Sequence, residues 1–274
     1  MAVYTEVDDD ALNDFLTRYD IGEAVAFKGI AEGVENSSYL LETTEARFIL
    51  TLYEKRVNPD DLPFFMGVME DLSAASFPCP QPVKGKNGSA LQTLLDKPAA
   101  IVTFLKGMSP RRPDANQCRQ IGEAMARMHL ALQTSSLGRP NNLSIHAWDE
   151  LYDGRESVAA TLAPNLATLI SGDLERLHDQ WPDPDTLPQG IIHADLFPDN
   201  AFFLGEKFSG VIDFYFACTD MLAYDVAIAL NAWCFEARGE FNMTKGRALM
   251  AGYDSVRSFT EAERKALPAL IHGA

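Results

Sequence analysis

The stretch His193-Ala194-Asp195-Leu196-Phe197-Pro198-Asp199-Asn200, followed by Gly210-Val211-Ile212-Asp213-Phe214, decides the fold and chemistry that this sequence predicts. It has the form H-x-D-x-x-x-x-N, and a later apolar run ends in a second Asp. Phosphoryl transfer from ATP uses these residue types in this order. One Asp orients the acceptor hydroxyl and takes its proton, while the Asn and the other Asp hold the Mg²⁺ that neutralises the triphosphate. We therefore expect a kinase whose catalytic loop lies between short strands.

Four residues of this stretch receive predicted roles. We predict that Asp195 is the catalytic base and that Asn200 and Asp213 bind Mg²⁺, because oxygen ligands suit this ion. His193 is expected to brace the loop by hydrogen bonding rather than to take part in the chemistry. Each residue alone has an ordinary explanation, such as a turn or the end of a strand. The prediction depends on their combination.

The charge of the chain limits its partners. The 274 residues include 23 Lys and Arg against 39 Asp and Glu, which gives a net charge of -16. A phosphate backbone or an anionic membrane surface attracts basic proteins, so we expect neither nucleic acid nor membrane as a partner. An acidic enzyme can still bind ATP, because Mg²⁺ and a few local cations supply the positive charge.

The sequence also indicates where the protein works. No apolar run approaches the ~20 residues that cross a bilayer, and the first residues do not resemble a signal peptide. The four cysteines are widely spaced, without the C-x-x-C pattern of a zinc site. We expect buried thiols in a reducing, cytoplasmic environment.

The first hundred residues alternate turn residues with short apolar segments. After a helix that begins near Asp8, we expect strands at 25–27, 38–41 and 47–53, a second helix after 58–63, and strands at 91–95 and 99–104. Such an order is typical of a small antiparallel sheet with helices.

The rest of the chain favours helices. Residues 106–110 are a candidate hinge, Asp114 is expected to cap a long helix, and one further helix is expected through the 150s to 170s. Asp225 is expected to be a helix N-cap. We therefore predict an α+β protein of two lobes: a nucleotide-binding lobe at 1–105 and a helical lobe at 106–274, which carries the catalytic loop and the acceptor site.

Two features of the first lobe could bind the nucleotide. The segment 29–39 contains Gly33 and Ser37 and could cover the phosphates with backbone N–H groups and hydroxyls, although it could also be an ordinary hairpin loop. Glu70, on the second helix, is a candidate partner for a phosphate-binding cation; the alternative is a solvated helix Glu.

The motif resembles the catalytic signature of the aminoglycoside phosphotransferase/choline kinase superfamily, which shares the protein-kinase-like fold. More narrowly, residues 33–39, 48–55, 121–129, 193–200 and 210–225 resemble bacterial homoserine kinases of that superfamily. The likeness covers nearly the whole chain, and its most specific part is the run from Asp213 to Asp225.

This resemblance implies ATP-dependent phosphorylation of the side-chain hydroxyl of L-homoserine to O-phospho-L-homoserine, a step of threonine biosynthesis. It implies ATP and Mg²⁺ as cofactors and places the adenine against Phe104 and Leu105. The superfamily usually has a Lys on the third strand, where this chain has Thr51. Lys55 or Arg56 could take its place.

Two other interpretations stay open at this point. The chain could be another small-molecule kinase of the same fold, acting on an aminoglycoside, a choline-like alcohol or another amino alcohol. It could also be a non-catalytic nucleotide-binding protein, which the missing strand Lys would favour. The last residues, 267–274, read as a helix that continues, so we expect a chain truncated at its C-terminus; the alternative is a naturally short variant.

Overall fold

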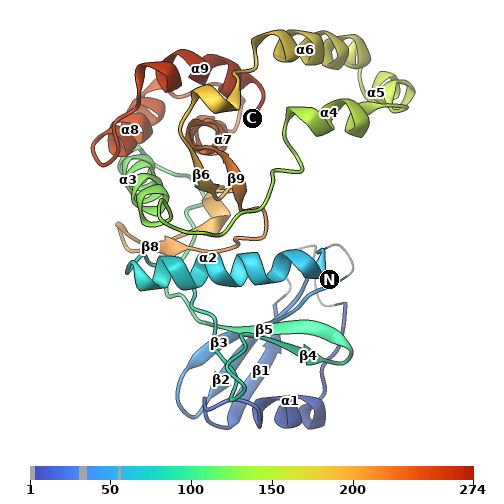
Figure 1. Cartoon of the computed structure of the whole chain (residues 1–274), viewed down its shortest axis with the longest axis vertical. Helices are drawn as coiled ribbons and strands as arrows, with labels where there is room; N and C mark the ends of the chain where they lie inside the picture. The colour runs from blue at the N-terminus through green and yellow to red at the C-terminus, as the bar shows by residue number, and fades with distance from the viewer. Residues whose placement is uncertain (1–3, 31–35, 55–56) are drawn as a thin grey trace. The chain divides into compact units, whose positions relative to one another are not determined.

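The computed structural model describes residues 4–30, 36–54 and 57–274, which form two compact units (Figure 1). The first unit comprises Met1–Met108, Phe202–Gly205 and Ser209–Tyr215. The second comprises Ser109–Ala201, Glu206–Phe208 and Phe216–Ala274. An antiparallel sheet characterises the first unit and helices dominate the second, so the predicted α+β kinase-like class is confirmed.

The first unit is built on a five-stranded antiparallel sheet in the order β1-β2-β3-β5-β4. Its strands are β1 (Ala24–Gly29), β2 (Ser37–Thr43), β3 (Arg47–Leu52), β4 (Leu91–Leu94) and β5 (Lys97–Thr103). Its helices are α1 (Asp9–Leu16) and α2 (Leu62–Ala74), and α2 follows a 3-10 turn at Pro59–Asp61. The strands and helices expected from the first hundred residues are thus all present, with small shifts at their ends.

One face of this sheet carries the core of the first unit. The register sets Tyr39 opposite Leu50 and Leu50 opposite Ile101, so one row of large apolar side chains crosses three strands. Phe15 of α1 is fully buried against this row. Asp8 begins the helix, because its carboxylate accepts a hydrogen bond from the Ala11 N–H. In Figure 1, α1 lies on one side of the sheet and α2 on the other.

The second unit consists of helices around a two-stranded sheet. The strands of this sheet are β6 (Gln189–Ile192) and β9 (Cys218–Met221). Strands β7 (Ala201–Leu204) and β8 (Lys207–Val211) form a separate hairpin, and most of its residues belong to the first unit. The helices are α3 (Ala115–Ala131), α4 (Ile145–Tyr152), α5 (Glu156–Leu162), α6 (Leu166–Gln180), α7 (Leu222–Cys234), α8 (Met243–Asp254) and α9 (Glu261–His272). The buried helix α7 packs against α3, α8 and α9.

Two expectations for this unit were wrong. The single helix expected through the 150s to 170s is three helices, α4 to α6, because Gly154 and Asn165 adopt left-handed backbone angles that end a right-handed helix. Strand β9 was not expected. Its four residues are too few for a periodic signal, and it forms by pairing Cys218 with Ile192 of β6. The expected cap was right: Asp114 and Gln117 form a capping box at the start of α3.

Helices α3 and α8 touch backbone to backbone. A Cβ atom at Gly122 of α3 would lie 2.1 Å from the Leu249 carbonyl oxygen, and a Cβ at Gly252 of α8 would lie 2.1 Å from the Arg119 carbonyl oxygen. Backbone atoms within helices cannot rotate away as a side chain can. The two glycines therefore set the separation of these helices.

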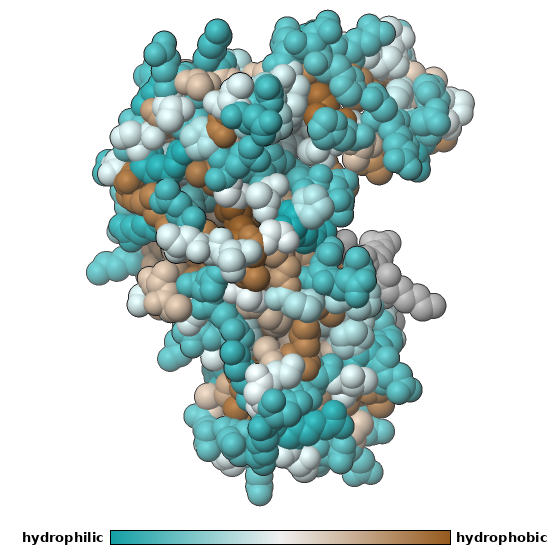
Figure 2. All heavy atoms as spheres, viewed as in Figure 1, coloured by the Kyte–Doolittle hydropathy of each residue, from teal (hydrophilic) through white to brown (hydrophobic). Residues whose placement is uncertain are grey.

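The surface of the described residues is mostly polar. Figure 2 shows hydrophilic side chains over most of the visible face of α4, α5 and α6, with isolated apolar ones between them. Among the described residues, no helix is both long enough and apolar enough to cross a membrane.

The close packing of α3 and α8 can be tested by adding one methyl group. We expect Gly252→Ala to lower the free energy of unfolding by about 1–3 kcal/mol, because the helices must separate to admit the Cβ. The matched control is Gly172→Ala in α6, where a Cβ meets no atom within 4 Å. This control should raise the free energy of unfolding by roughly 0.5–1 kcal/mol, because alanine favours a helix over glycine. Urea unfolding of both variants measures the two effects, and equal effects would contradict the packing described.

Candidate active site

The loop between β6 and β7 brings two of the predicted residues together. The Asn200 side-chain amide donates to the Asp195 backbone oxygen at 2.8 Å and to its carboxylate Oδ2 at 2.9 Å. A 3-10 turn at Pro198–Asn200 makes this contact possible, since it folds the chain back within five residues. The H-x-D-x-x-x-x-N spacing therefore produces a direct contact between the proposed base and a proposed Mg²⁺ ligand.

Asn200 is oriented by these bonds. Its NH₂ group donates both hydrogen bonds to Asp195, and no described residue donates to its carbonyl oxygen. The side chain is nearly buried. Its oxygen atom therefore remains available to a hard cation such as Mg²⁺.

The start of the loop is held by a carboxylate from α7. Ala194 has a φ of 61°, a left-handed conformation that costs a non-glycine residue about 1–3 kcal/mol. The Asp225 carboxylate accepts hydrogen bonds from the His193 N–H at 3.1 Å and from the Ala194 N–H at 2.9 Å. Because Asp225 is fully buried, these charge-assisted bonds are not weakened by water. They hold the strained turn that precedes Asp195.

Asp225 is itself held by a buried hydrogen-bond chain. His129 of α3 lies between it and Tyr253 of α8: Nε2 is 2.9 Å from the Asp225 Oδ2, and Nδ1 is 2.8 Å from the Tyr253 hydroxyl oxygen. A carboxylate can only accept, so Nε2 carries the proton. Arg257 Nη1 donates to the Tyr253 oxygen at 3.2 Å, which leaves the hydroxyl proton for His129 Nδ1. The hydrogen-bond chain therefore runs from Arg257 through Tyr253, His129 and Asp225 to the loop that carries Asp195.

These contacts correct the expected role of Asp225. The helix begins at Leu222 with Met221 as its N-cap, so Asp225 is not a cap. Burial alone would raise the pKa of the Asp225 carboxyl. The hydrogen bond from His129, its electrostatic interaction and that of His193, and the bond from Ala194 outweigh burial and lower the pKa below its ordinary 3.8. Asp225 thus stays ionised at neutral pH.

Two further contacts fix the loop. His193 is fully buried, and its Nδ1 accepts a hydrogen bond from the Asp195 N–H at 3.2 Å. Trp233 of α7 donates from Nε1 to the Leu196 carbonyl oxygen at 2.7 Å. Backbone groups before and after Asp195 are thus bound by the same helix.

Asp213 belongs to the first unit and also has a left-handed backbone, with a φ of 64°. The Tyr53 and Tyr215 hydroxyl oxygens lie 3.0 Å apart beside it. Burial raises the pKa of Tyr215 to about 12, and the Asp213 charge adds to this effect. Thr51, at the position where the family usually has a Lys, has its hydroxyl oxygen 3.4 Å from that of Ser38 on strand β2.

The other residues expected to bind the nucleotide lie in different surroundings. Ser37 is fully buried, and its hydroxyl accepts from the Tyr4 and Thr5 N–H groups and donates to Glu54. These bonds tie the residues before α1 to strand β2 and to Glu54. The partner of Glu70 is Lys84, at 3.0 Å and half-exposed.

Two expected contacts with adenine, Phe104 and Leu105, directly follow β5 and are half-buried. The Phe104 N–H donates to the Arg47 carbonyl oxygen at 3.1 Å, which continues the pairing of β5 with β3. Gly33 and Lys55, the remaining nucleotide-binding predictions, lie outside the described residues, as does Arg56.

Sequence analysis missed one cation in the first unit. Lys97 at the start of β5 donates to the Glu54 carboxylate and to the Thr5 hydroxyl. Burial alone would raise the pKa of Glu54, but hydrogen bonds from Lys97, Ser37 and Thr5 outweigh it and lower the pKa below the ordinary 4.5. Nothing in the sequence signals this pair, because it depends on the register that sets the end of β3 beside the start of β5.

No group of three or more His, Cys, Asp or Glu side chains is arranged to bind a metal within the ranges described. Mg²⁺ in phosphoryl transfer needs only one or two protein oxygens, with water and substrate phosphates as the other ligands. Asn200 and Asp213 each offer an oxygen atom of the kind that this ion prefers.

Comparison with known families agrees with this chemistry. Residues 26–259 match the model of the phosphotransferase enzyme family. The chain belongs to this family. Because its members transfer phosphoryl groups from a nucleotide, ATP use follows from membership.

Curated relatives match over the whole chain. The chain is 57% identical to a homoserine kinase of Hyphomonas neptunium, over 100% of this chain and 86% of the relative. It is 56% identical to a homoserine kinase of Xanthobacter autotrophicus and 55% identical to one of Rhodospirillum rubrum, in each case over 100% of this chain and 85% of the relative.

Solved structures share the fold at low identity. An amicoumacin kinase in complex with AMP-PNP and Ca²⁺ aligns with a TM-score of 0.73 at 15% identity, covering 97% of this chain and 83% of that one. A microcompartment-associated aminopropanol kinase aligns with a TM-score of 0.69 at 21% identity, covering 96% and 86%. These structures support the kinase-like fold of the family.

The role of Asp225 can be tested by Asp225→Asn. The amide cannot accept both loop N–H bonds with full charge, and a displaced loop of this kind can cost about 100-fold in kcat. Removing one partner of a buried pair should also lower the free energy of unfolding by about 3 kcal/mol or more. The control is Asp254→Asn, a half-exposed carboxylate that bonds Phe259 and Arg264. Its kcat should be unchanged, and a normal kcat for Asp225→Asn would contradict the proposed support.

The same variant gives a pH test. The pKa of Asp225 is lower in the folded protein than in the unfolded chain. Its ionised carboxylate therefore adds to the free energy of unfolding above the unfolded pKa, and this addition is lost as pH falls through the folded pKa. The difference in free energy of unfolding between wild type and Asp225→Asn should be constant above about pH 5 and shrink below about pH 4. A difference that grows on acidification would contradict the sign of the shift.

Proposed function

We propose that this chain transfers the γ-phosphoryl group of ATP to the side-chain hydroxyl of L-homoserine, giving O-phospho-L-homoserine. One observation carries the proposal: homoserine kinases are 52–57% identical to this chain over its whole length. Membership of the phosphotransferase family supports the reaction class independently of the acceptor. The product places the enzyme in threonine biosynthesis.

Asp195 is the proposed base. Its carboxylate accepts a hydrogen bond from the acceptor hydroxyl and takes the proton as that oxygen attacks the γ-phosphorus. The bond from Asn200 to Oδ2 fixes the carboxylate in one orientation. The bonds from α7 to the loop fix the backbone beneath it. Most of the catalytic gain then comes from positioning, as phosphoryl transfer requires.

Asn200 and Asp213 are the proposed Mg²⁺ ligands. Asn200 offers its amide oxygen, because its NH₂ group is bound to Asp195. Asp213 offers a carboxylate from a constrained turn. When bound, Mg²⁺ neutralises the phosphate charge that builds up during transfer.

The acceptor is tested by ADP release from the purified protein with Mg²⁺ and ATP. L-homoserine is compared with kanamycin, choline and L-serine. We expect turnover with L-homoserine alone and a product with the mass of O-phospho-L-homoserine. Turnover only with another alcohol would keep the kinase reaction and remove the proposed acceptor. ADP release with none of the four would favour a non-catalytic nucleotide-binding protein.

The base is tested in the same assay. Asp195→Asn should bind ATP normally and lower kcat by about 10²–10⁴-fold, the usual contribution of a general base. The matched control is Asp199→Asn, which changes an exposed carboxylate in the same loop. Its kcat should stay near that of the wild type. Equal effects of the two variants would remove Asp195 from its role.

A further inference from the structure

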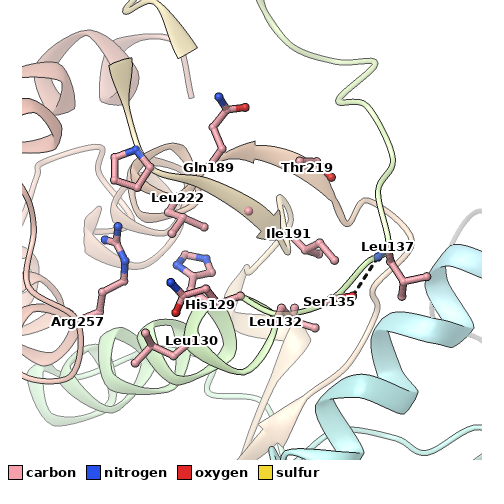
Figure 3. A pocket seen from close by; sticks show the side chains of 13 residues that line it. His129, Leu130, Leu132, Ser135, Leu137, Gln189, Ile191, Thr219, Leu222 and Arg257 are labelled. Carbon is pink, nitrogen blue, oxygen red and sulfur yellow. Dashed lines mark hydrogen bonds between the residues drawn. The ribbon is translucent and has the colours of Figure 1, made fainter. Parts of the chain in front are cut away.

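The second unit contains a cavity of about 250 Å³ that none of the proposed catalytic residues lines (Figure 3). It lies among the end of α3 and the segment after it, strand β6, Thr219 of β9, the start of α7, and Arg257 after α8. Figure 3 shows Arg257 and His129 on one side of the cavity and Ser135 and Leu137 on the other.

The charge of the lining is unlike that of the chain. The protein carries 39 Asp and Glu against 23 Lys and Arg, but the lining contains one Arg and no Asp or Glu. Arg257 is the cation, and its side chain is 13% exposed. Its charge is partly balanced by Glu263, at 2.8 Å. Its Nη1 atom makes this ion pair and also donates to Tyr253, whereas no described residue accepts a hydrogen bond from Nε or Nη2. These remaining N–H donors, among neutral polar groups, favour a ligand that carries a carboxylate.

The remaining lining favours a small ligand with an aliphatic body. Leu132, Ile191 and Leu222 give the cavity an apolar wall, while Gln133 and Gln189 give it polar groups that can form hydrogen bonds. The volume is below the roughly 300–1,000 Å³ of pockets for drug-sized ligands. This volume suits a carboxylate whose aliphatic body is about as large as an amino-acid side chain.

The cavity is connected to the catalytic loop by hydrogen bonds. Arg257 and His129 both line it and both belong to the buried chain that holds Asp225. Asp225 in turn accepts the N–H groups of His193 and Ala194. A ligand in the cavity therefore contacts two members of the chain that sets the loop conformation.

We propose that this cavity binds a small aliphatic carboxylate and that binding lowers the turnover of the enzyme. The ligand's carboxylate pairs with Arg257, and its aliphatic part lies on the leucine and isoleucine wall. Arg257 then shares its N–H groups between the ligand, Glu263 and Tyr253. The bond to Tyr253 weakens, the Tyr253–His129–Asp225 bonds readjust, and the loop bonds of Asp225 loosen. Binding in the cavity changes turnover because the loop is held differently in the bound and unbound protein, which is the condition for coupling between two sites.

The binding experiment uses 4-methylpentanoate as probe and titrates it, by calorimetry and by NMR, into the full chain without ATP or acceptor. The control ligand is 4-methylpentanamide, which has nearly the same shape and no charge. We expect millimolar or tighter binding of the carboxylate and at least fivefold weaker binding of the amide. Absence of carboxylate binding, or equal binding of the amide, would overturn the proposal.

A matched pair of variants tests the location. Gln133 lines the cavity, is exposed, and forms no side-chain hydrogen bond with another described residue, so it can change without loss of folding. Gln133→Glu should weaken carboxylate binding by about fivefold and Gln133→Lys should strengthen it by a similar factor, from the change in Coulomb energy. Equal affinity in both variants would place the probe elsewhere and overturn the assignment.

The turnover experiment tests the coupling. ADP release is measured with the accepted alcohol at saturating ATP, with and without saturating 4-methylpentanoate. We expect kcat to fall by at least fivefold, within the usual range of coupling between sites. The same concentration of 4-methylpentanamide should leave it unchanged. An unchanged kcat with the site occupied would overturn the coupling. The binding experiment needs no acceptor, so it gives a result even if L-homoserine is not the substrate.

Discussion

One buried carboxylate determines the shape of the loop that carries the proposed base. Asp225 accepts the N–H groups of His193 and Ala194, and the left-handed backbone of Ala194 depends on these bonds. Without them the turn before Asp195 would relax, since a non-glycine residue in that conformation is strained. A carboxylate is suited to this task because it accepts several strong bonds at once. The position of the proposed base is therefore set from beneath the loop, by helix α7.

Burial of such a charge requires partners, and the second unit supplies them from different helices. His129 comes from α3 and Tyr253 from α8, the two helices whose glycines allow backbone contact. The close packing of α3 and α8 thus brings the His129 and Tyr253 side chains within hydrogen-bond distance. The packing of the second unit and the position of the proposed base depend on the same residues. A change in the helix packing should therefore affect the loop as well as the free energy of unfolding.

Sequence analysis succeeded where the information is local. The motif predicts a loop between short strands, which the structure places between β6 and β7, and Asp114 predicts the start of α3 from its own neighbours. It failed where a role depends on residues far apart in the chain. Asp225 has the pattern of a helix cap, but its partner His129 lies 96 positions away and was not assigned a role. Strand β9 likewise exists only through pairing with β6.

The central claim is that the Asp225 carboxylate holds the backbone of the loop, and amide hydrogen exchange measures this directly. If the claim is right, the amides of His193 and Ala194 should exchange as slowly as the amides in the buried core of α3 and α7. The loop amides and the helix amides would then exchange only when the second unit opens as a whole. In Asp225→Asn these two amides should exchange much faster than the core amides. Fast exchange of both amides in the wild-type protein, with the helix core still protected, would contradict the account.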